Sequence, residues 1–306
     1  MDSTIVEQQV GHKQAYALLA CTVLLWAIGV VTARGVHEEI PLIGLSFWRW
    51  CTAAVILLPF VWRDLMARSA LFRKYFLLLA VQGMLIVGSG TLLFYSLNFT
   101  TAINATLVNA AQPVLTVLLA WVVLKERLNR LQLIGICSAF TGVGIMVTRA
   151  SWSVITHLDF NTGDILVILA ICGYAMYAIN IRKLPRELGT FPALLVILVS
   201  GSLLLLPFYM AESFYVKPVS FNLKFTGIIM ILALLVSILS ISMWNTANAV
   251  VGPGRAAIFV NLMPVYGSVL AIVFLGEKLY LYHVAGAVLV CTGIFLVVNE
   301  RWHDTA

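Results

Sequence analysis

The chain has 306 residues, of which 61% are hydrophobic and only 10% are charged. A soluble domain is about 45–50% apolar and about 25% charged, so this chain has too few charges to cover a solvated surface. The composition therefore excludes a soluble globular protein and predicts an integral membrane protein. The net charge of +6 is attributed to Lys and Arg in loops and does not indicate nucleic acid as a partner.

Ten apolar segments are each long enough to cross a bilayer, which needs about 20 residues. Backbone polar groups in lipid must be satisfied within their own segment, so these segments are predicted to be helices. The expected spans are residues 14–34, 41–62, 75–97, 102–124, 131–149, 163–182, 191–210, 224–248, 255–275 and 280–299. The polar residues before the first span do not form a cleavable signal peptide.

The distribution of Lys and Arg predicts the orientation of the chain. With the N-terminus inside, the inner segments hold thirteen of these residues and the outer loops hold five. Basic residues favour the cytoplasmic side of a membrane, so both termini are expected to be cytoplasmic. Short loops and bare tails suit a bacterial inner membrane.

The second half of the chain repeats the first. A shift of 151 positions brings four features into register, with Pro113 on Pro264, Glu126 on Glu277, Gly135 on Gly286, and Thr141-Gly142 on Thr292-Gly293. Each unit has five spans, an odd number, so the second unit must be inverted in the membrane, as in many secondary transporters. The expected organisation is a tail (1–13), a first repeat (14–149), a connecting loop (150–162), a second repeat (163–299) and a tail (300–306).

Several motifs resemble one known family. They are LLWAIGVVTAR in the first span, FWRW in the second, LLFYSL in the third, and QPVLTVLLAWVVLKE with its second copy LMPVYGSVLAIVFLGE. The chain resembles the drug/metabolite transporter superfamily, in its EamA-type ten-helix branch. The resemblance implies export of amino acids, related metabolites or drugs, and some members move nucleotide sugars. Lys125 departs from the family pattern, which has a glycine at that turn.

Polar and aromatic residues recur at helical spacing on several spans, so each set shares one face. Such stripes can line a central cavity for a small substrate. Ser, Thr and Asn also join helices to one another, at about 0.6 kcal/mol each, and Tyr and Trp also populate interface belts. The candidate substrate-binding residues are Trp26, Thr91, Tyr95, Asn98, Asn109, Gln112, Tyr174, Tyr177, Ser240, Trp244, Asn248 and Asn261.

Arg49 is the basic residue placed well inside a predicted span. At a helix centre an arginine costs about 2.5–3.5 kcal/mol. It is a candidate anion contact for a carboxylate substrate, and the alternative is a structural pairing with backbone carbonyls at a helix end. Pro113 and Pro264 are candidate hinges, because each removes a backbone hydrogen bond within a span, and a static kink is the alternative.

No acidic residue is placed deep in a span. Glu126 and Glu277 close the fourth and ninth spans, where pairing within the turn is expected, and Asp164 opens the sixth. A proton-coupled carrier usually holds a carboxylate or histidine within the membrane. The sequence therefore favours facilitated diffusion or exchange.

The sequence predicts an all-α secondary transporter that exports small metabolites, most of all amino acids, by alternating access. The alternatives are a drug or organic-solute efflux carrier and, from other classes, a membrane receptor or a membrane-embedded enzyme. No enzyme motif, cofactor or metal is expected, and the five cysteines are small apolar fillers. The expected partners are a small-molecule substrate and the bilayer. The glycines of the fifth and tenth spans are expected to pack those helices either against the bundle or against a second copy of the chain, and they are Gly135, Gly142, Gly144, Gly286 and Gly293.

Overall fold

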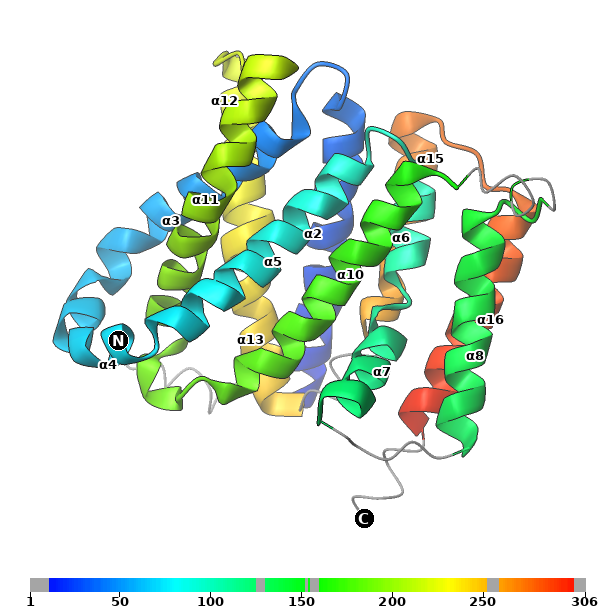
Figure 1. The fold of residues 1–306 in the computed structure, drawn as a ribbon, viewed down its shortest axis with the longest axis horizontal. Helices are drawn as coiled ribbons and strands as arrows, with labels where there is room; N and C mark the ends of the chain where they lie inside the picture. Colours follow the sequence, from blue (N-terminus) through cyan, green and yellow to red (C-terminus); the bar gives the residue numbers. More distant parts are fainter. Residues whose placement is uncertain (1–10, 125–129, 152–153, 155–159, 252–258, 300–306) are drawn as a thin grey trace.

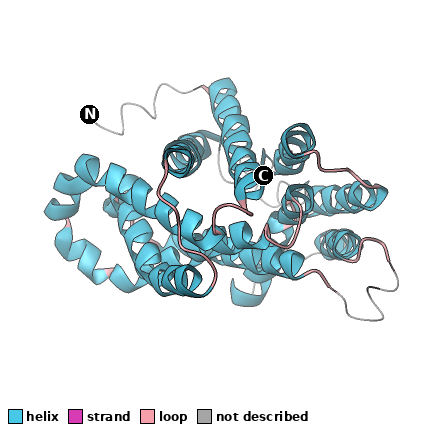
Figure 2. Cartoon of the chain, turned by 90° about the horizontal axis from the view of Figure 1, so that it is seen from above, coloured by secondary structure: helices cyan, strands magenta, loops and turns pink. Residues whose placement is uncertain are grey.

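The structure is a computed structural model, and it describes residues 11–124, 130–151, 154, 160–251 and 259–299. Regular structure in these residues is helical throughout, with no strand among them, as Figure 2 shows. A bilayer leaves few other choices, because an open strand edge in lipid would carry unsatisfied N–H and C=O groups. The predicted all-α class is confirmed for the described residues.

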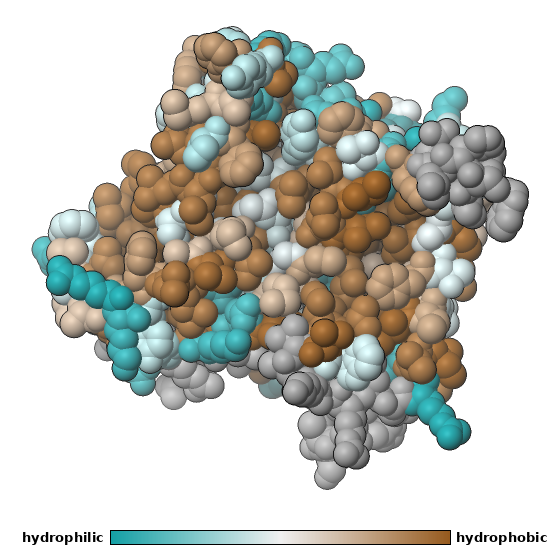
Figure 3. Space-filling model, in the orientation of Figure 1, coloured by the Kyte–Doolittle hydropathy of each residue, from teal (hydrophilic) through white to brown (hydrophobic). Residues whose placement is uncertain are grey.

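Eight described helices are long and apolar enough to cross a membrane. They span His12–Val36 (α2), Leu42–Ala67 (α3), Phe76–Ser96 (α5), Ala102–Leu119 (α6 with most of α7), Arg130–Val147 (α8), Thr162–Asn180 (α10), Thr190–Tyr215 (α11) and Leu223–Asn248 (α12 to α13). Two shorter apolar helices cover Val260–Leu275 and Leu281–Leu296. The chain is a multi-pass membrane protein, and brown apolar side chains cover most of the face in Figure 3.

Each of the ten predicted spans overlaps one of these segments, although two fall short of the usual spanning length. The ten-helix topology therefore stays a prediction. The shorter described elements are α4 (Ser69–Lys74), η1 (Ile181–Lys183) and η2 (Arg186–Leu188). Glu126, Arg255 and most of the predicted connecting loop 150–162 lie outside the described residues.

The fourth and ninth spans, which contain Pro113 and Pro264, are each interrupted just before the proline. The fourth span consists of α6 (Ala102–Asn109) and α7 (Gln112–Leu124), and Pro113 is the second residue of α7. In the ninth, the turn η4 (Val260–Leu262) precedes α15 (Met263–Leu275), and Pro264 is the second residue there. The prolines were expected inside continuous helices. In the first turn a missing N–H costs nothing, so proline fits this position without breaking a hydrogen bond.

The eighth span changes its helical pitch midway. It begins as α12 (Leu223–Ile231), continues as the π-helical segment η3 (Leu232–Leu239) and ends as α13 (Ser240–Val251). The hydroxyl of Ser240 donates to the carbonyl of Val236 at 2.5 Å, so a side chain supports this transition. Such π-helical segments are rare and are frequently found at functional sites.

The helices pack in a regular pattern. α3 lies against α11, α6 against α15, and α8 against α16, while α5 packs on α10 and α11, and α2 packs on α13 and α15. Figure 1 shows α5 and α10 running side by side through the middle and the α8–α16 pair at one edge. The largest apolar core includes residues of α2, α6, α7, α8 and α10, and a second core lies between α3, α5 and α11.

Glycines bring α8 and α16 (Leu281–Asn299) into close contact. A side-chain carbon at Gly142 would lie 2.6 Å from the carbonyl oxygen of Gly286, and one at Gly293 would meet the backbone of Gly135. Gly144 differs, because the space beside it is open. These glycines serve packing within one chain, as small residues do in membrane helices. The homodimer remains a prediction.

The turn after α15 shows why a glycine precedes Glu277. Gly276 ends the helix in a left-handed conformation with φ of 65°, which glycine adopts without steric strain. Glu277 then accepts hydrogen bonds from the N–H groups of Ala102 at 2.8 Å and Ile103 at 2.9 Å. Its carboxylate thus satisfies free donors at the start of α6, where negative charge is favourable.

Candidate functional site

Arg49 lies in the second turn of α3 and is buried, with 4% of its surface exposed. Its guanidinium carbon lies 4.0 Å from the ring centroid of Trp50 and 4.4 Å from that of Phe94. Both distances are within the range of a cation–π interaction. The side chain therefore points into the bundle, held between aromatic rings of α3 and α5, and does not reach out to the membrane surface.

Gly90 of α5 leaves room beside this guanidinium. A side-chain carbon at position 90 would lie 3.3 Å from Nη2 of Arg49, 3.3 Å from the hydroxyl of Tyr174 and 3.1 Å from the indole of Trp50. Glycine thus allows α3, α5 and α10 to converge on one point. We call Arg49, Trp50, Gly90, Phe94 and Tyr174 the arginine cluster.

The arginine cluster contains hydrogen-bond donors without partners. Within the described residues, Nε of Arg49 and Nε1 of Trp50 are buried and make no hydrogen bond. The ion pairs in that part of the chain, Arg34–Glu277 and Lys224–Glu39, do not involve Arg49. The alternative of Arg49 pairing with backbone carbonyls gains no support. A planar cation with free donors matches a carboxylate, which it can bind through two parallel hydrogen bonds.

A second group of predicted residues meets between α2 and α13. The indole nitrogen of Trp26 donates to the hydroxyl of Ser240 at 3.0 Å. The ring of Trp26 lies 5.2 Å from that of Trp244, at an angle of 39°. Trp26, Ser240 and Trp244 therefore form one contiguous set, which we call the tryptophan pair with Ser240. It adjoins the end of the π-helical segment.

Three predicted asparagines carry buried oxygens without partners. The side-chain carbonyls of Asn109, Asn248 and Asn261 make no hydrogen bond within the described residues. Asn109 is the last residue of α6 and Asn261 lies in η4, so both stand where a span is interrupted before its proline. A buried amide oxygen left unpaired costs about 1–3 kcal/mol, so these atoms are available to a bound solute or to water.

Other predicted residues have local roles. The hydroxyl of Thr91 donates to Val87 at 2.7 Å and lies 2.9 Å from that of Ser46, so it links α5 to α3. Asn98 donates to the carbonyl of Tyr95 at 3.0 Å, beyond the end of α5.

The remaining predicted residues have these positions. The ring of Tyr95 packs edge-on against Phe99. Gln112 begins α7, where its carbonyl accepts from Thr116. Tyr177 lies in α10, three residues after Tyr174, and is partly buried.

Known proteins identify the class to which this arrangement belongs. A model of the EamA-like transporter family matches residues 13–148 and matches again over residues 161–299. The chain belongs to the EamA-like transporter family. A solved crystal structure shares the fold, with a TM-score of 0.59 and 15% identity over 96% of this chain and 99% of that one.

Relatives of this EamA-like transporter carry transporter names. Uncharacterized transporter YetK of Bacillus subtilis is 28% identical over 97% of this chain and 89% of its own length. A probable amino-acid metabolite efflux pump of Salmonella typhimurium is 28% identical over 92% of this chain and 93% of its own length. A protein of the same name from Escherichia coli is 26% identical over 93% and 95%.

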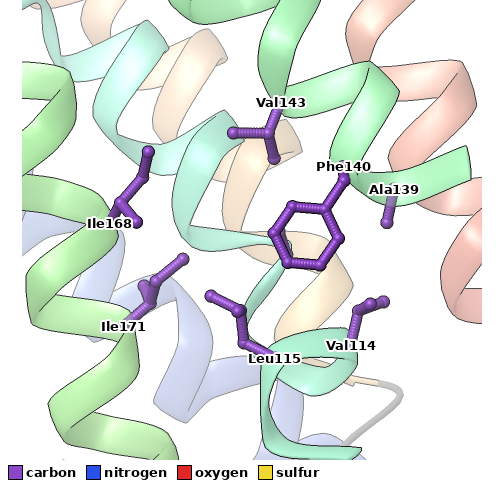
Figure 4. A pocket seen from close by; sticks show the side chains of 8 residues that line it. Val114, Leu115, Ala139, Phe140, Val143, Ile168 and Ile171 are labelled. Atoms are coloured by element: carbon purple, nitrogen blue, oxygen red, sulfur yellow. The ribbon is translucent and has the colours of Figure 1, made fainter. Parts of the chain in front are cut away.

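The EamA-like chain also has a small apolar cavity of about 50 Å³. Figure 4 shows its lining side chains on α7, α8 and α10, among them Leu115, Phe140 and Ile171. All lining residues are apolar, so the cavity offers no group that would orient a polar solute, and an apolar void of this kind stays dry.

Sequence reasoning did not place Trp50, Gly90 or Phe94 among the candidate site residues. Gly90 and Phe94 are four residues apart on α5, which places them on one face of that helix. That spacing was a usable signal, but it did not indicate that Arg49 of α3 faces the same point.

Proposed function

We propose that this EamA-like transporter exports small metabolites that carry a carboxylate, with amino acids as the favoured class. The observation that carries the proposal is the buried guanidinium of Arg49, which has no anionic partner among the described residues. The printed names of the Salmonella and Escherichia relatives, which refer to amino-acid metabolite efflux, support both the class and the direction.

Energetics favour a carboxylate as the missing partner. An arginine at the centre of a membrane helix costs about 2.5–3.5 kcal/mol, and that cost falls when the charge finds a partner. A charge-assisted pair is about twice as strong as a neutral hydrogen bond, and the planar fork of arginine matches two carboxylate oxygens. The hydroxyl of Tyr174 and the indole of Trp50 meet the guanidinium beside Gly90, where they can add contacts to a bound carboxylate.

Alternating access between two inverted repeats is the proposed mechanism. Three helix pairs, α3–α11, α6–α15 and α8–α16, join spans that occupy equivalent places in the two halves. If the first half is superposed on the second, the α5–α10 contact corresponds to the α13–α2 contact. The double match of one family model supports repeats at 14–149 and 163–299. The two halves rock about the arginine cluster, with the interruptions before Pro113 and Pro264 as hinges and both termini cytoplasmic.

Counterflow in proteoliposomes tests the proposal. Vesicles are loaded with an unlabelled amino acid mixture, and uptake of a labelled amino acid is measured for the wild type, Arg49→Gln and Arg49→Lys. We expect wild-type counterflow, a loss of about tenfold or more in Arg49→Gln, and partial retention in Arg49→Lys, which keeps the charge but not the fork. Arg63→Gln, on the exposed end of the same helix, is the matched control and should leave counterflow unchanged.

Counterflow that survives in Arg49→Gln would overturn the assignment of Arg49. Absence of counterflow with any amino acid, in a wild type that exchanges an uncharged organic solute, would favour the drug-efflux alternative.

A further inference from the structure

The first turn of α10 holds a carboxylate that is buried almost completely. Asp164 is 1% exposed. Its Oδ1 accepts a hydrogen bond from the hydroxyl of Thr100 at 2.6 Å and another from the amide of Asn104. That amide also donates to the Thr100 hydroxyl at 3.2 Å. One carboxylate thus ties together three segments, the connection from α5 to α6, α6 itself and α10.

The second oxygen of this carboxylate has no partner. Oδ2 of Asp164 is buried and makes no hydrogen bond within the described residues, and the same holds for Oδ1 of Asn104, which is 7% exposed as a residue. An ionised carboxylate can accept on both oxygens. A buried oxygen without a hydrogen bond costs free energy, and this cost is far greater for an anion than for a neutral carboxylic acid.

Among the described residues, the charged and titratable groups that act on Asp164 come from two further segments. Arg149, after α8, acts electrostatically on Asp164 and on His283. Tyr282, at the start of α16, interacts with both Arg149 and Asp164. His283 is 3% exposed and accepts from the backbone of Tyr280 at 3.1 Å. None of these groups forms an ion pair with Asp164 in the described part of the chain.

A bound metal ion is a poor match for these surroundings. The described residues contain no group of three or more His, Cys, Asp or Glu that would hold one. Arg149 would also repel a second fixed cation. A proton needs a single free oxygen, and Oδ2 of Asp164 provides it.

We propose that Asp164 is a proton-binding site of this carrier, and that the proton exchanges with the aqueous phase at the end of the bundle where α5 ends and α10 begins. On protonation the proton from water binds Oδ2, and the carboxylate charge changes from −1 to zero. The hydrogen bonds from Thr100 and Asn104 to Oδ1 then weaken, because they lose an anionic acceptor. The three segments are freed to separate at that end.

The inference that this proton is coupled to transport rests on the proposed function, whereas proton binding itself does not. Proton coupling would revise the expectation of facilitated diffusion. That expectation was based on Asp164 opening the sixth span, and on no acidic residue lying deep within a span. The position is indeed at the helix start, but α6 and the preceding connection cover it.

Two readouts on the purified full chain test the proposal. The first is the thermal unfolding midpoint of wild type and Asp164→Asn from mildly acidic to mildly alkaline pH, without substrate. The second uses proteoliposomes with a pH-sensitive dye inside, in which substrate is added outside and the internal pH change is followed. We expect a pH-dependent midpoint and a substrate-driven pH change in the wild type. In Asp164→Asn the midpoint should depend less on pH and the pH change should vanish, while counterflow persists.

Glu212→Gln is the control for a buried carboxylate. Glu212 is 6% exposed, and both of its oxygens accept backbone N–H groups, of Ile43 at 3.1 Å and Gly44 at 2.6 Å. Its substitution should leave the substrate-driven pH change intact.

Thr100→Val is the second variant that tests the proposal if Asp164→Asn does not fold. It removes one donor to Oδ1 while keeping the shape of the side chain, so the anion is less favoured and the pH profile of the midpoint should move toward alkaline pH. An unmoved profile would contradict the proposal.

Other outcomes would overturn it as well. A substrate-driven pH change that survives in Asp164→Asn would place the proton elsewhere. A wild-type midpoint that rises when sodium replaces choline, and does not in Asp164→Asn, would assign an alkali cation to the site. Loss of counterflow in the wild type itself would instead count against the proposed function.

Discussion

Arg34 and Glu277 form an ion pair, with Nε of Arg34 3.7 Å from Oε1 of Glu277. The carboxylate also accepts the two N–H groups at the start of α6, and Arg34 donates to the carbonyl of Leu97 at 2.5 Å. One short turn thus fastens three segments at the same end of the bundle, the last turn of α2, the end of α5 and the start of α6. The acidic turn was expected to pair locally, and its partners lie far away in the sequence.

Glu277→Gln should lower the stability of the protein by about 1–3 kcal/mol, because a charged acceptor of two backbone donors is replaced by a weaker one. Gly276→Ala should cost roughly 1–2 kcal/mol, since alanine is strained in the left-handed conformation found at this residue. Thermal unfolding in detergent measures both. If Glu277→Gln and the wild type have the same thermal unfolding midpoint, the carboxylate does not stabilise the start of α6.

Gly142 and Gly144 offer a matched test of the α8–α16 contact. Alanine in a helix interior is favoured over glycine by about 1 kcal/mol, so Gly144→Ala, facing open space, should raise the unfolding midpoint slightly. Gly142→Ala should lower it, because overpacking costs about 1–3 kcal/mol and the backbone of Gly286 lies too close to yield. Equal midpoints for the two variants would show that α8 and α16 do not meet as described.

Gly88 and Gly90 provide a similar pair for the arginine cluster. Both lie in α5 and gain the same helix propensity on substitution, but only position 90 faces Arg49 and Tyr174. Gly90→Ala should weaken amino acid binding by about tenfold, roughly 1.4 kcal/mol, with little change in stability. Gly88→Ala should bind as the wild type does. Titration of each variant with substrate, followed by intrinsic tryptophan fluorescence, makes the comparison.

The hydrogen bond from Trp26 to Ser240 should contribute about 0.5–1.5 kcal/mol. Trp26→Phe and Ser240→Ala each remove it, and the double variant should lose little more than either single one, since all three lack the same bond. Chemical unfolding of the four proteins measures this coupling. Fully additive losses would mean that the two side chains do not interact in the membrane-embedded protein.

The helices were predictable because a bilayer dictates both their length and their composition. The places where spans are interrupted were harder to predict. Pro113 and Pro264 were recognised, but whether a proline kinks a helix or begins a new one depends on the turn before it, here Ala110–Ala111 and η4.

The candidate site was predicted in part. The first helix and the eighth were expected to share a cavity face, and Trp26 does meet Ser240 and Trp244. Tyr95 was expected in the same cavity as Trp244. Helical spacing shows which residues share one face of a helix, but it does not show at which level of the bundle that face meets another helix.

The burial of Arg49 and Asp164 was also not predictable from the sequence. Arg49 is close to a helix start and was compatible with reaching the surface. The residues that enclose it, Phe94, Gly90 and Tyr174, belong to helices distant in sequence. Asp164 likewise stands at a helix start, and Thr100 and Asn104 cover it from other segments.

The central claim is that Arg49 binds the carboxylate of a transported metabolite. The most direct test is the thermal shift of purified wild type and Arg49→Gln with two matched ligands, an amino acid and its carboxamide, since a ligand that binds the folded state raises the unfolding midpoint. We predict that the wild type is stabilised by the acid and much less by the amide, and that Arg49→Gln loses this preference. Equal stabilisation by both ligands, or an acid preference that persists in Arg49→Gln, would contradict it.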